Sequence, residues 1–348
     1  MKAAYFYGVH DIRLEEVPIP EITDNDILVK VKMCAICGTD LRIFNFGHFK
    51  IKEGDKRVLG HEVVGEIVKV GKNVTGYQVG QRVATPPNFG CGHCEMCRKG
   101  YGQLCPDYDA FGISVDGGFE EYMLVPGHAI DMGNVVPIPD GCSYEQAVLA
   151  EPLSCCYNSY KALQTEPGDS LLVIGAGPIG ALHCMINKLA GATKIMIADI
   201  SQDRLDMLKE IDENFILINS GKVDLYEEVM KLTDGRGVDV VITACSVPQL
   251  QNEALRLAAK HGRINFFGGL PKGKENVELL TNNIHYKELT VVGTTGSTLV
   301  QYINALNIIA SGGLDVAPLV TKRFSIDQVN DAFAYAATGK GMKTVVEF

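Results

Sequence analysis

The two halves of the chain differ in the pattern of their hydrophobic and polar positions. Up to about residue 150, apolar and polar residues alternate over short stretches, in Ile27–Lys32 and more clearly in Val63–Val70. Such alternation is typical of half-buried strands. Glycines break this part of the chain at short intervals: Gly60, Gly65, Gly71, Gly76 and Gly80. Many short strands with glycine turns predict an antiparallel, barrel-like domain.

Beyond residue 152 apolar runs alternate with helical patterns. Strands are expected at Ser170–Ile174, Lys194–Ala198, Phe215–Ile218, Val238–Thr243, Arg263–Phe267 and Leu289–Val292. Helices are expected at Ile179–Ala190, Gln202–Ile211, Leu225–Leu232 and Leu250–Ala259. Strands spaced by helices predict an α/β fold with a doubly wound parallel sheet, and six strands make up a full dinucleotide-binding sheet.

The last part of the chain departs from this alternation. We expect a helix at Leu299–Ala310, a stop at Gly312-Gly313, a helix near Ile326–Thr338 and a final strand at Thr344–Phe348. We expect this tail to return to the first domain. The predicted domains are therefore 1–152 with 294–348, and 153–293.

Composition and charge exclude several classes of partner. The 348 residues are 46% hydrophobic and 21% charged, and the formal net charge is −10. An acidic chain repels the phosphate backbone, so nucleic acid is not expected as a partner. No apolar run approaches the ~18 to 20 residues that span a bilayer, so no membrane partner is expected. The N-terminus lacks the apolar core of a signal peptide, which predicts a cytoplasmic protein.

A glycine-rich segment follows the first strand of the predicted sheet. It spans Gly175–Gly180, comes directly after Ser170–Ile174 and opens a helix, as a dinucleotide fingerprint requires. Gly175 makes the tight turn, Gly177 lets the backbone approach a pyrophosphate, and Gly180 allows close packing of helix and strand. The helix that begins at Pro178 and Ile179 presents free N–H groups to the anion. These residues are candidate cofactor ligands.

Asp199 ends the next predicted strand, 19 residues after Gly180. An acid at this position accepts hydrogen bonds from the ribose hydroxyls and repels a 2′-phosphate, which favours NAD over NADP. Arg204 lies five residues further on and softens this preference. The alternative interpretation is a plain turn, with Asp199 placed near the N-terminus of the following helix.

Cysteines supply the clearest metal signal. The chain has 11, and an odd number in a chain expected to be cytosolic argues against a disulfide framework. Four of them lie in one glycine-rich stretch: Cys91, Cys94, Cys97 and Cys105. Four thiolates in a closed tetrahedral site are the pattern of structural zinc. An iron–sulfur cluster takes the same ligands, but no electron-relay partner is visible.

Four further residues have ligand chemistry but are ambiguous one by one. They are Cys37, His61, Glu62 and Glu151. A catalytic zinc needs about three protein ligands and one open position, which a thiolate, an imidazole and a carboxylate satisfy. Each also has a structural interpretation: a core thiol, a core histidine, a solvated strand acid, and an acid at a helix N-terminus before Pro152.

Taken together, these elements resemble the zinc-dependent medium-chain alcohol dehydrogenases over the whole chain. The segment Gly60–Gly71 closely resembles that family's zinc signature, and the Cys37–Asp40 element, the four-cysteine loop, Glu151–Leu153 and Gly175–Gly180 occur in the family's order and spacing. Within the family, Glu-Pro-Leu looks more like the sorbitol, or polyol, dehydrogenase branch.

The resemblance implies a GroES-like catalytic domain and a Rossmann NAD-binding domain, with two Zn²⁺ ions per chain and NAD as cofactors. It implies Cys37, His61 and Glu62 at the catalytic zinc, with Glu151 as a fourth ligand or bound through water. It implies Thr39 as the hydroxyl that takes the substrate's proton. Cys91, Cys94, Cys97 and Cys105 hold the structural zinc in this interpretation.

The sequence departs from the family at one step of the proton path. Three residues after Thr39, where many members carry a histidine, this chain has Arg42. Water or His48 then remains to pass the proton onward. Gln81, where the family often has Asp, looks structural.

The expected partner is a small-molecule alcohol, and a secondary alcohol within a polyol such as sorbitol is favoured. A phosphorylated polyol is the alternative, because four basic residues precede His61: Lys50, Lys52, Lys56 and Arg57. A plain secondary alcohol or threonine stays open. Outside this class are a zinc-free NADPH quinone reductase and a non-enzymatic metal-binding protein. The strand near Leu289–Val292 at the sheet edge predicts a homo-oligomer, a tetramer or else a dimer.

Overall fold

A computed structural model describes all residues from Met1 to Phe348. The chain divides into two compact units, Met1–Ser154 with Gly296–Phe348, and Cys155–Thr295. A membrane-spanning helix must be both long and strongly apolar, and no helix of the structure is both.

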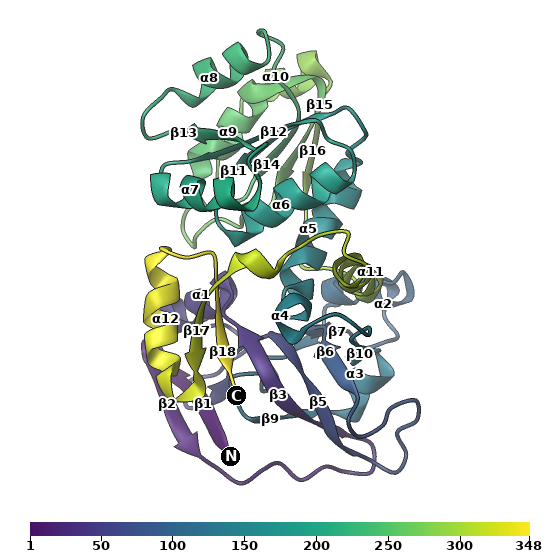
Figure 1. Ribbon diagram of the computed structural model, residues 1–348. Coiled ribbons are helices and arrows are strands. Elements are labelled where there is room, and N and C mark those ends of the chain that lie inside the picture. The colour runs from purple at the N-terminus through teal and green to yellow at the C-terminus, as the bar shows by residue number, and fades with distance from the viewer. The chain divides into compact units, whose positions relative to one another are not determined.

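The first unit is built mainly from strands (Figure 1). Its strands are β1 (Lys2–Gly8), β2 (Asp11–Glu16), β3 (Ile27–Ala35), β4 (Arg57–Val58), β5 (Glu62–Val70), β6 (Arg82–Thr85), β7 (Asn88–Phe89), β8 (Asp109–Ala110), β9 (Tyr122–Val125), β10 (Val136–Pro137), β17 (Val320–Ser325) and β18 (Lys343–Glu347). Its helices are α1 (Gly38–Phe46), α2 (Glu95–Arg98), α3 (Gly127–Asp131), α4 (Tyr144–Ala147), α11 (Leu299–Ala310) and α12 (Val329–Thr338), with 3₁₀ turns at Gly102–Leu104, Ala317–Leu319 and Ile326–Gln328.

The largest sheet of this unit joins residues from both ends of the chain. Its order is β10-β6-β5-β3-β18-β17, and β9 also pairs with β3. β3 runs antiparallel to both β5 and β18, with Ala35 opposite Glu62 on one side and opposite Val345 on the other. One hydrophobic core joins these strands to α12, through residues such as Val63 and Phe333. The last part of the chain therefore contributes strands and a helix to the first unit.

The second unit is a doubly wound sheet. Its strands are β11 (Ser170–Ile174), β12 (Lys194–Asp199), β13 (Ile216–Asn219), β14 (Val238–Thr243), β15 (Ala258–Phe266) and β16 (Thr290–Gly293). Its helices are α6 (Pro178–Leu189), α7 (Gln202–Ile211), α8 (Leu225–Leu232), α9 (Pro248–Leu257) and α10 (Thr281–Lys287), and α5 (Ala150–Leu163) leads into it from the first unit.

All six strands of this sheet are parallel, in the order β13-β12-β11-β14-β15-β16. Right-handed crossovers place α6 and α7 on one face and α9 and α10 on the other (Figure 1). The order reverses beside β11, and in such sheets ligands bind at the carboxyl ends of the strands at this switch point. The predicted α/β fold class, with a β-rich domain and a doubly wound parallel sheet, is confirmed.

One predicted helix ends early, and β17 and α10 are among the elements that were not predicted. The helix predicted to Ala259 ends at Leu257, because the chain extends at Ala258 and pairs there with Val238 as part of β15. The strand β17 was not expected, since its exposed Thr321, Lys322 and Arg323 hide any alternation. The helix α10, whose positions are all at least partly exposed, was also missed.

Candidate metal centres and cofactor site

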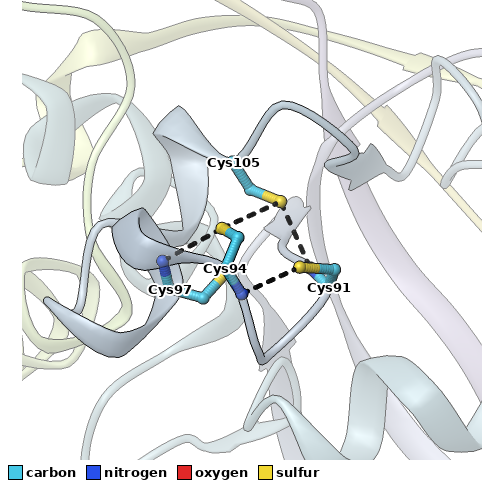
Figure 2. A group of neighbouring side chains, drawn as sticks. All are labelled: Cys91, Cys94, Cys97 and Cys105. Carbon is cyan, nitrogen blue, oxygen red and sulfur yellow. Dashed lines mark hydrogen bonds between the residues drawn. The ribbon is translucent and has the colours of Figure 1, made fainter.

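The four cysteines of the predicted structural site come together in one short loop of the first unit (Figure 2). Their sulfur atoms all lie within 4.8 Å of one another, and the sulfurs of Cys94 and Cys105 are 3.7 Å apart. A tetrahedral site with Zn–S bonds of ~2.3 Å places sulfurs ~3.8 Å apart. The residues therefore fit a zinc ion.

The backbone of the loop supports these sulfurs. The N–H groups of Cys91, Cys94 and Cys97 donate to the sulfurs of Cys105, Cys91 and Cys94, at 3.3, 3.3 and 3.4 Å. Backbone donors, from His93 and then Cys94, lower the pKa of Cys91 to about 6. Gly90 is needed here because a Cβ at that position would lie 2.4 Å from the sulfur of Cys97. The loop is thus shaped to hold four thiolates.

The second group lies inside the first unit. The ligand atoms of Cys37, His61 and Glu62 fall within 4.8 Å of one another, and His61 and Glu62 are 7% and 0% exposed. Cys37 precedes the first turn of α1, and Glu62 begins β5. One oxygen of Glu62, Oε2, is buried without a hydrogen-bond partner. An orphaned carboxylate oxygen beside a thiol and an imidazole fits a zinc ion with an open position.

Asp40 supports this group, although the sequence analysis had not given it a role. It is fully buried, and its Oδ2 accepts a hydrogen bond of 2.8 Å from the N–H of Cys37. Its Oδ1 lies 3.3 Å from Nδ1 of His61, which leaves Nε2 as the nitrogen available to an ion. An acid three residues after a helix N-cap is a capping-box signal that pointed to this residue.

Lys343 is the second supporting residue that the sequence analysis missed. Its Nζ lies 2.5 Å from Oε1 of Glu62, and the two side chains are 4% and 0% exposed. Burial raises the pKa of Glu62 to about 7, and Lys343 acts in the opposite direction. Because 281 residues separate the two partners, no local pattern announces the pair.

Glu151 and Thr39 lie near this group in different ways. Glu151 stands at the start of α5, is 7% exposed, and interacts electrostatically with Glu62 and Lys343. It is outside the set of three whose ligand atoms lie within 4.8 Å. Thr39 is half-buried in the first turn of α1, two residues after Cys37.

His48, which follows Thr39 in the sequence, is the histidine that could continue the proton path. The ring of His48 stacks on Phe49, and its Nδ1 accepts a hydrogen bond from the N–H of Lys50. Burial lowers the pKa of His48, and the charges of Lys50 and Arg42 act in the same direction. This lowered pKa disfavours the imidazolium form, so His48 takes up a proton less readily than an exposed histidine does.

Three of the four basic residues before His61 are engaged elsewhere. Lys50 donates to the carbonyl of Tyr108, Lys56 pairs with Glu15 at 3.0 Å, and Arg57 pairs with Asp116 at 2.8 Å. The structure does not bring these cations together around one point.

The glycine-rich segment has the shape of a pyrophosphate cradle. Gly177 is the N-cap of α6, with Pro178 and Ile179 in the first turn. A Cβ on Gly177 would meet nothing within 4 Å, whereas one on Gly180 would lie 1.9 Å from the carbonyl oxygen of Gly175. Gly177 therefore leaves open space at the helix N-terminus, and Gly180 permits close packing, as a dinucleotide requires.

Asp199 closes the same site at the end of β12. Its carboxylate accepts hydrogen bonds from the N–H groups of Ala176 and Ser201, at 2.7 and 2.9 Å. Arg204 places Nη1 3.8 Å from Oδ2 of Asp199. The acid is thus fixed by the glycine loop itself, next to a cation.

Fold and metal groups together define a two-unit, zinc-binding dehydrogenase. The model of the alcohol dehydrogenase GroES-like domain matches residues 23–140, and that of the zinc-binding dehydrogenase matches residues 178–311. The L-threonine 3-dehydrogenase of Pyrococcus furiosus is 33% identical over 99% of this chain and 97% of its own length. The sorbitol dehydrogenase of Bacillus subtilis is 33% identical over 97% of this chain and 93% of its own.

Solved structures of similar proteins point to the same class of enzyme. A zinc-binding dehydrogenase of Sinorhizobium meliloti 1021, bound to NADP, superposes with a TM-score of 0.91 at 30% identity, covering 100% of this chain and 99% of its own. An alcohol dehydrogenase of Escherichia coli CFT073, in complex with NADH, gives 0.90 at 29% identity with the same coverage. The chain belongs to the zinc-binding medium-chain alcohol dehydrogenase family.

The expected enzyme class and cofactors are therefore confirmed. The protein is a zinc- and NAD-dependent dehydrogenase that acts on an alcohol, with one four-cysteine zinc site and one Cys/His/Glu site in each chain.

Proposed function

We propose that the protein oxidises a secondary hydroxyl of a small polyol, such as sorbitol, and passes the hydride to NAD. The group formed by Cys37, His61 and Glu62 carries the reaction type, because its buried donors fit a zinc ion with an open position. The Glu151–Leu153 element and the sorbitol dehydrogenase relative support the polyol class.

Each residue of the first unit has a distinct task in this proposal. Cys37, His61 and Glu62 hold the zinc, and Glu151 completes the set directly or through water. Bound zinc supplies Lewis acidity, which lowers the pKa of a substrate hydroxyl. Asp40 keeps His61 oriented, since its carboxylate lies 3.3 Å from Nδ1.

Thr39 is the proposed acceptor of the substrate's proton. The oxidation converts a secondary alcohol and NAD⁺ into a ketone, NADH and one proton, so this proton must leave the site. Thr39 accepts it at Oγ1 and releases its own hydroxyl proton onward. Because Arg42 cannot accept a proton, water or His48 takes the next step.

The residues of the second unit bind the cofactor, and NAD supplies the hydride acceptor. The backbone N–H groups of Gly177 and Ile179 mark the helix terminus that receives the pyrophosphate. Pro178, which has no N–H, lies in the first turn between them. Asp199 receives the ribose hydroxyls and disfavours a 2′-phosphate, while Arg204 reduces that discrimination. We therefore propose a preference for NAD over NADP.

Threonine is the second candidate substrate. Several relatives that match nearly the full chain are L-threonine 3-dehydrogenases, which favours a hydroxyl amino acid as the alternative. A phosphorylated polyol has less support, because Lys50, Lys56 and Arg57 are engaged with other partners.

We also propose that the chain forms a homotetramer, or else a dimer. β16 is the edge strand of its sheet, and an unpaired edge is a template for pairing with a second copy. The mass of the protein in dilute solution, measured by light scattering, distinguishes these states from a monomer.

The test is to follow NAD reduction by the purified protein with sorbitol, xylitol, their phosphates, L-threonine and 2-propanol. NADP replaces NAD in a parallel series. We expect the highest kcat/KM with a free polyol and NAD. A clear preference for threonine would replace the polyol assignment, and activity confined to the phosphates would reject it. Higher kcat/KM with NADP would contradict the role given to Asp199.

A further inference from the structure

A buried lysine touches the proposed catalytic metal group from a distant part of the chain. Lys343 is 3% exposed, and its Nζ lies 2.5 Å from Oε1 of Glu62. The second carboxylate oxygen, Oε2, is equally buried but has no hydrogen-bond partner. The two oxygens of one carboxylate therefore have different surroundings: Oε1 contacts a cation, and Oε2 is buried without a partner.

Strand register creates this arrangement. β3 lies between β5 and β18, and Ala35 is opposite Glu62 on one side and Val345 on the other. The N–H of Ile36 donates to the carbonyl of Thr344 at 2.9 Å. Lys343 and Glu62 thus begin the two strands that flank β3, at the end of the sheet where β3 leads into Cys37. The backbone fixes both partners before any ion is bound.

The charges around Lys343 show what the pair does. Burial disfavours the charged form of Lys343, whereas Glu62, Cys37 and Glu151 favour it, in that order of their Coulomb effects. A zinc ion held by Cys37, His61 and Glu62 would bring the net charge of that set to zero, and the buried carboxylates of Glu151 and Asp40 add two negative charges around it. The fixed ammonium group of Lys343 offsets one of them. In a buried site such a balance matters, because uncompensated charge is costly there.

An ion pair that served stability alone would not need this construction. A buried pair is often no more stabilising than apolar residues of the same volume, because desolvation offsets the attraction. A buried carboxylate oxygen without a partner adds a further cost. Both costs are removed when Oε2 contacts an ion while Oε1 stays on Lys343.

We propose that Lys343 is a positioning residue of the catalytic metal centre. It fixes Oε1 of Glu62, leaves Oε2 free for the ion, and offsets negative charge of the buried carboxylates around the ligand set. This inference rests on the proposed ligand roles of Cys37, His61 and Glu62, and it is independent of which alcohol is the substrate.

The experiment measures metal binding by the full-length protein. Variants Lys343→Met and Lys343→Arg are compared with wild type and with Lys322→Met, which makes the same change at an exposed lysine on the adjacent strand β17. Zinc per chain is counted, zinc affinity is measured by chelator competition, and the visible spectrum is recorded after substitution with Co²⁺.

Lys343→Met removes the ammonium group and should weaken zinc binding at the Cys37, His61 and Glu62 group about 10- to 100-fold. This is the usual effect of losing a residue that supports a metal ligand. Lys343→Met should also change the Co²⁺ absorption bands, because Glu62 no longer has a fixed orientation. In Lys343→Met the pH profile of kcat/KM should shift by about one unit toward higher pH, because the loss of the ammonium group makes the surroundings of the metal more negative. Lys343→Arg should recover most of the affinity, and Lys322→Met should match wild type.

A double-mutant cycle covers the case in which Lys343→Met fails to fold. Lys343→Met is added to Glu62→Gln, which removes the carboxylate that the lysine holds. If Lys343 acts through Glu62, the second change should alter zinc affinity less than about twofold in this background. An equal loss in both backgrounds, or wild-type affinity and spectrum in Lys343→Met, would overturn the inference. Binding of a single zinc ion by the wild type would instead overturn the ligand assignment, and the inference with it.

Discussion

The two metal groups of the first unit are assembled in opposite ways. The four cysteines come from one stretch, Cys91 to Cys105, and backbone N–H groups of the same loop support their sulfurs. Cys37, His61 and Glu62 come from two separate elements, and their support comes from Asp40 and from Lys343, 281 residues away from Glu62. Three of the four cysteines are partly exposed, whereas His61 and Glu62 are buried.

This difference separates two uses of a metal. A loop that carries its own ligands and donors is organised by its ion, so the ion contributes to local folding. A group assembled by a sheet is positioned by the fold, so the ion contributes chemistry. Each prediction below tests whether the two groups are separable in this way.

The largest effect is expected from a change in the group of Cys37, His61 and Glu62. Cys37→Ser should reduce kcat/KM by at least about a thousandfold, because the loss of even one electrostatic contact to the reacting atoms costs 10²- to 10³-fold in other enzymes. NAD binding, measured by calorimetry, should stay within about twofold of wild type. Cys142→Ser, the same change at a buried thiol of the same unit, is the control and should keep full activity. Substantial turnover by zinc-depleted Cys37→Ser would show that the group is not catalytic.

The second largest effect is expected from a change in the four-cysteine group, and it concerns stability. Cys97→Ser should lower the zinc content by one ion per chain and make the loop from Phe89 to Ala110 sensitive to proteolysis. The midpoint of thermal unfolding should fall, by roughly 2 to 4 °C for each kcal/mol lost. Folded protein should lose less than about tenfold in kcat. A complete loss of activity at full stability would erase the distinction between the two groups.

A smaller effect is expected when a supporting residue is changed. Asp40→Asn removes the charge beside His61 and leaves the shape, so zinc affinity at the second group should fall about 10- to 100-fold. Asp26→Asn is a matched control, because Asp26 is also largely buried and accepts N–H groups from Thr23 and Gly127. That control should affect stability without changing zinc affinity, which a chelator titration measures. Equal zinc loss in both variants would assign Asp40 a general structural role.

The smallest effect concerns a buried carboxyl group for which, unlike Glu62, no basic residue offsets the effect of burial. Burial raises the pKa of Glu120 well above its usual value, and nearby Asp116 adds to the shift. The folded state then holds this proton to higher pH than the unfolded state, so stability falls as pH rises from about 4.5 toward the folded pKa.

Glu120→Gln should therefore be more stable than wild type at pH 8, by a few degrees in the melting temperature, and the advantage should shrink toward pH 5. Thermal unfolding at several pH values measures this difference. Glu121→Gln, at the adjacent and partly exposed residue, should show no such trend. A constant difference between Glu120→Gln and wild type at all pH values would contradict the proposed titration.

Local signals explain which elements could be predicted from the sequence. The predicted ranges Gln202–Ile211, Leu225–Leu232 and Leu299–Ala310 are the observed α7, α8 and α11. Each begins after a side chain that caps its first turn, namely Ser201, Asp224 and Thr298. Caps and helical periodicity are both local, so a single sequence contains them.

Long-range effects explain what could not be predicted. The strand β17 is extended because it pairs with β18, although its own residues are mostly exposed. Four-cysteine spacing predicts a metal loop by itself, whereas Cys37, His61 and Glu62 had structural interpretations when taken singly. The partner of Glu62 is determined by strand order, and strand order is not a local property.

The position of β18 also determines when the two groups are completed during synthesis. The four cysteines emerge within a few residues of one another, so their zinc has a complete ligand set early. Lys343 is made 281 residues after Glu62. At translation rates of about 5 to 20 residues per second, this is a delay of roughly 14 to 56 s. Until then Glu62 lacks its ion-pair partner, so the catalytic group is the later of the two to be completed.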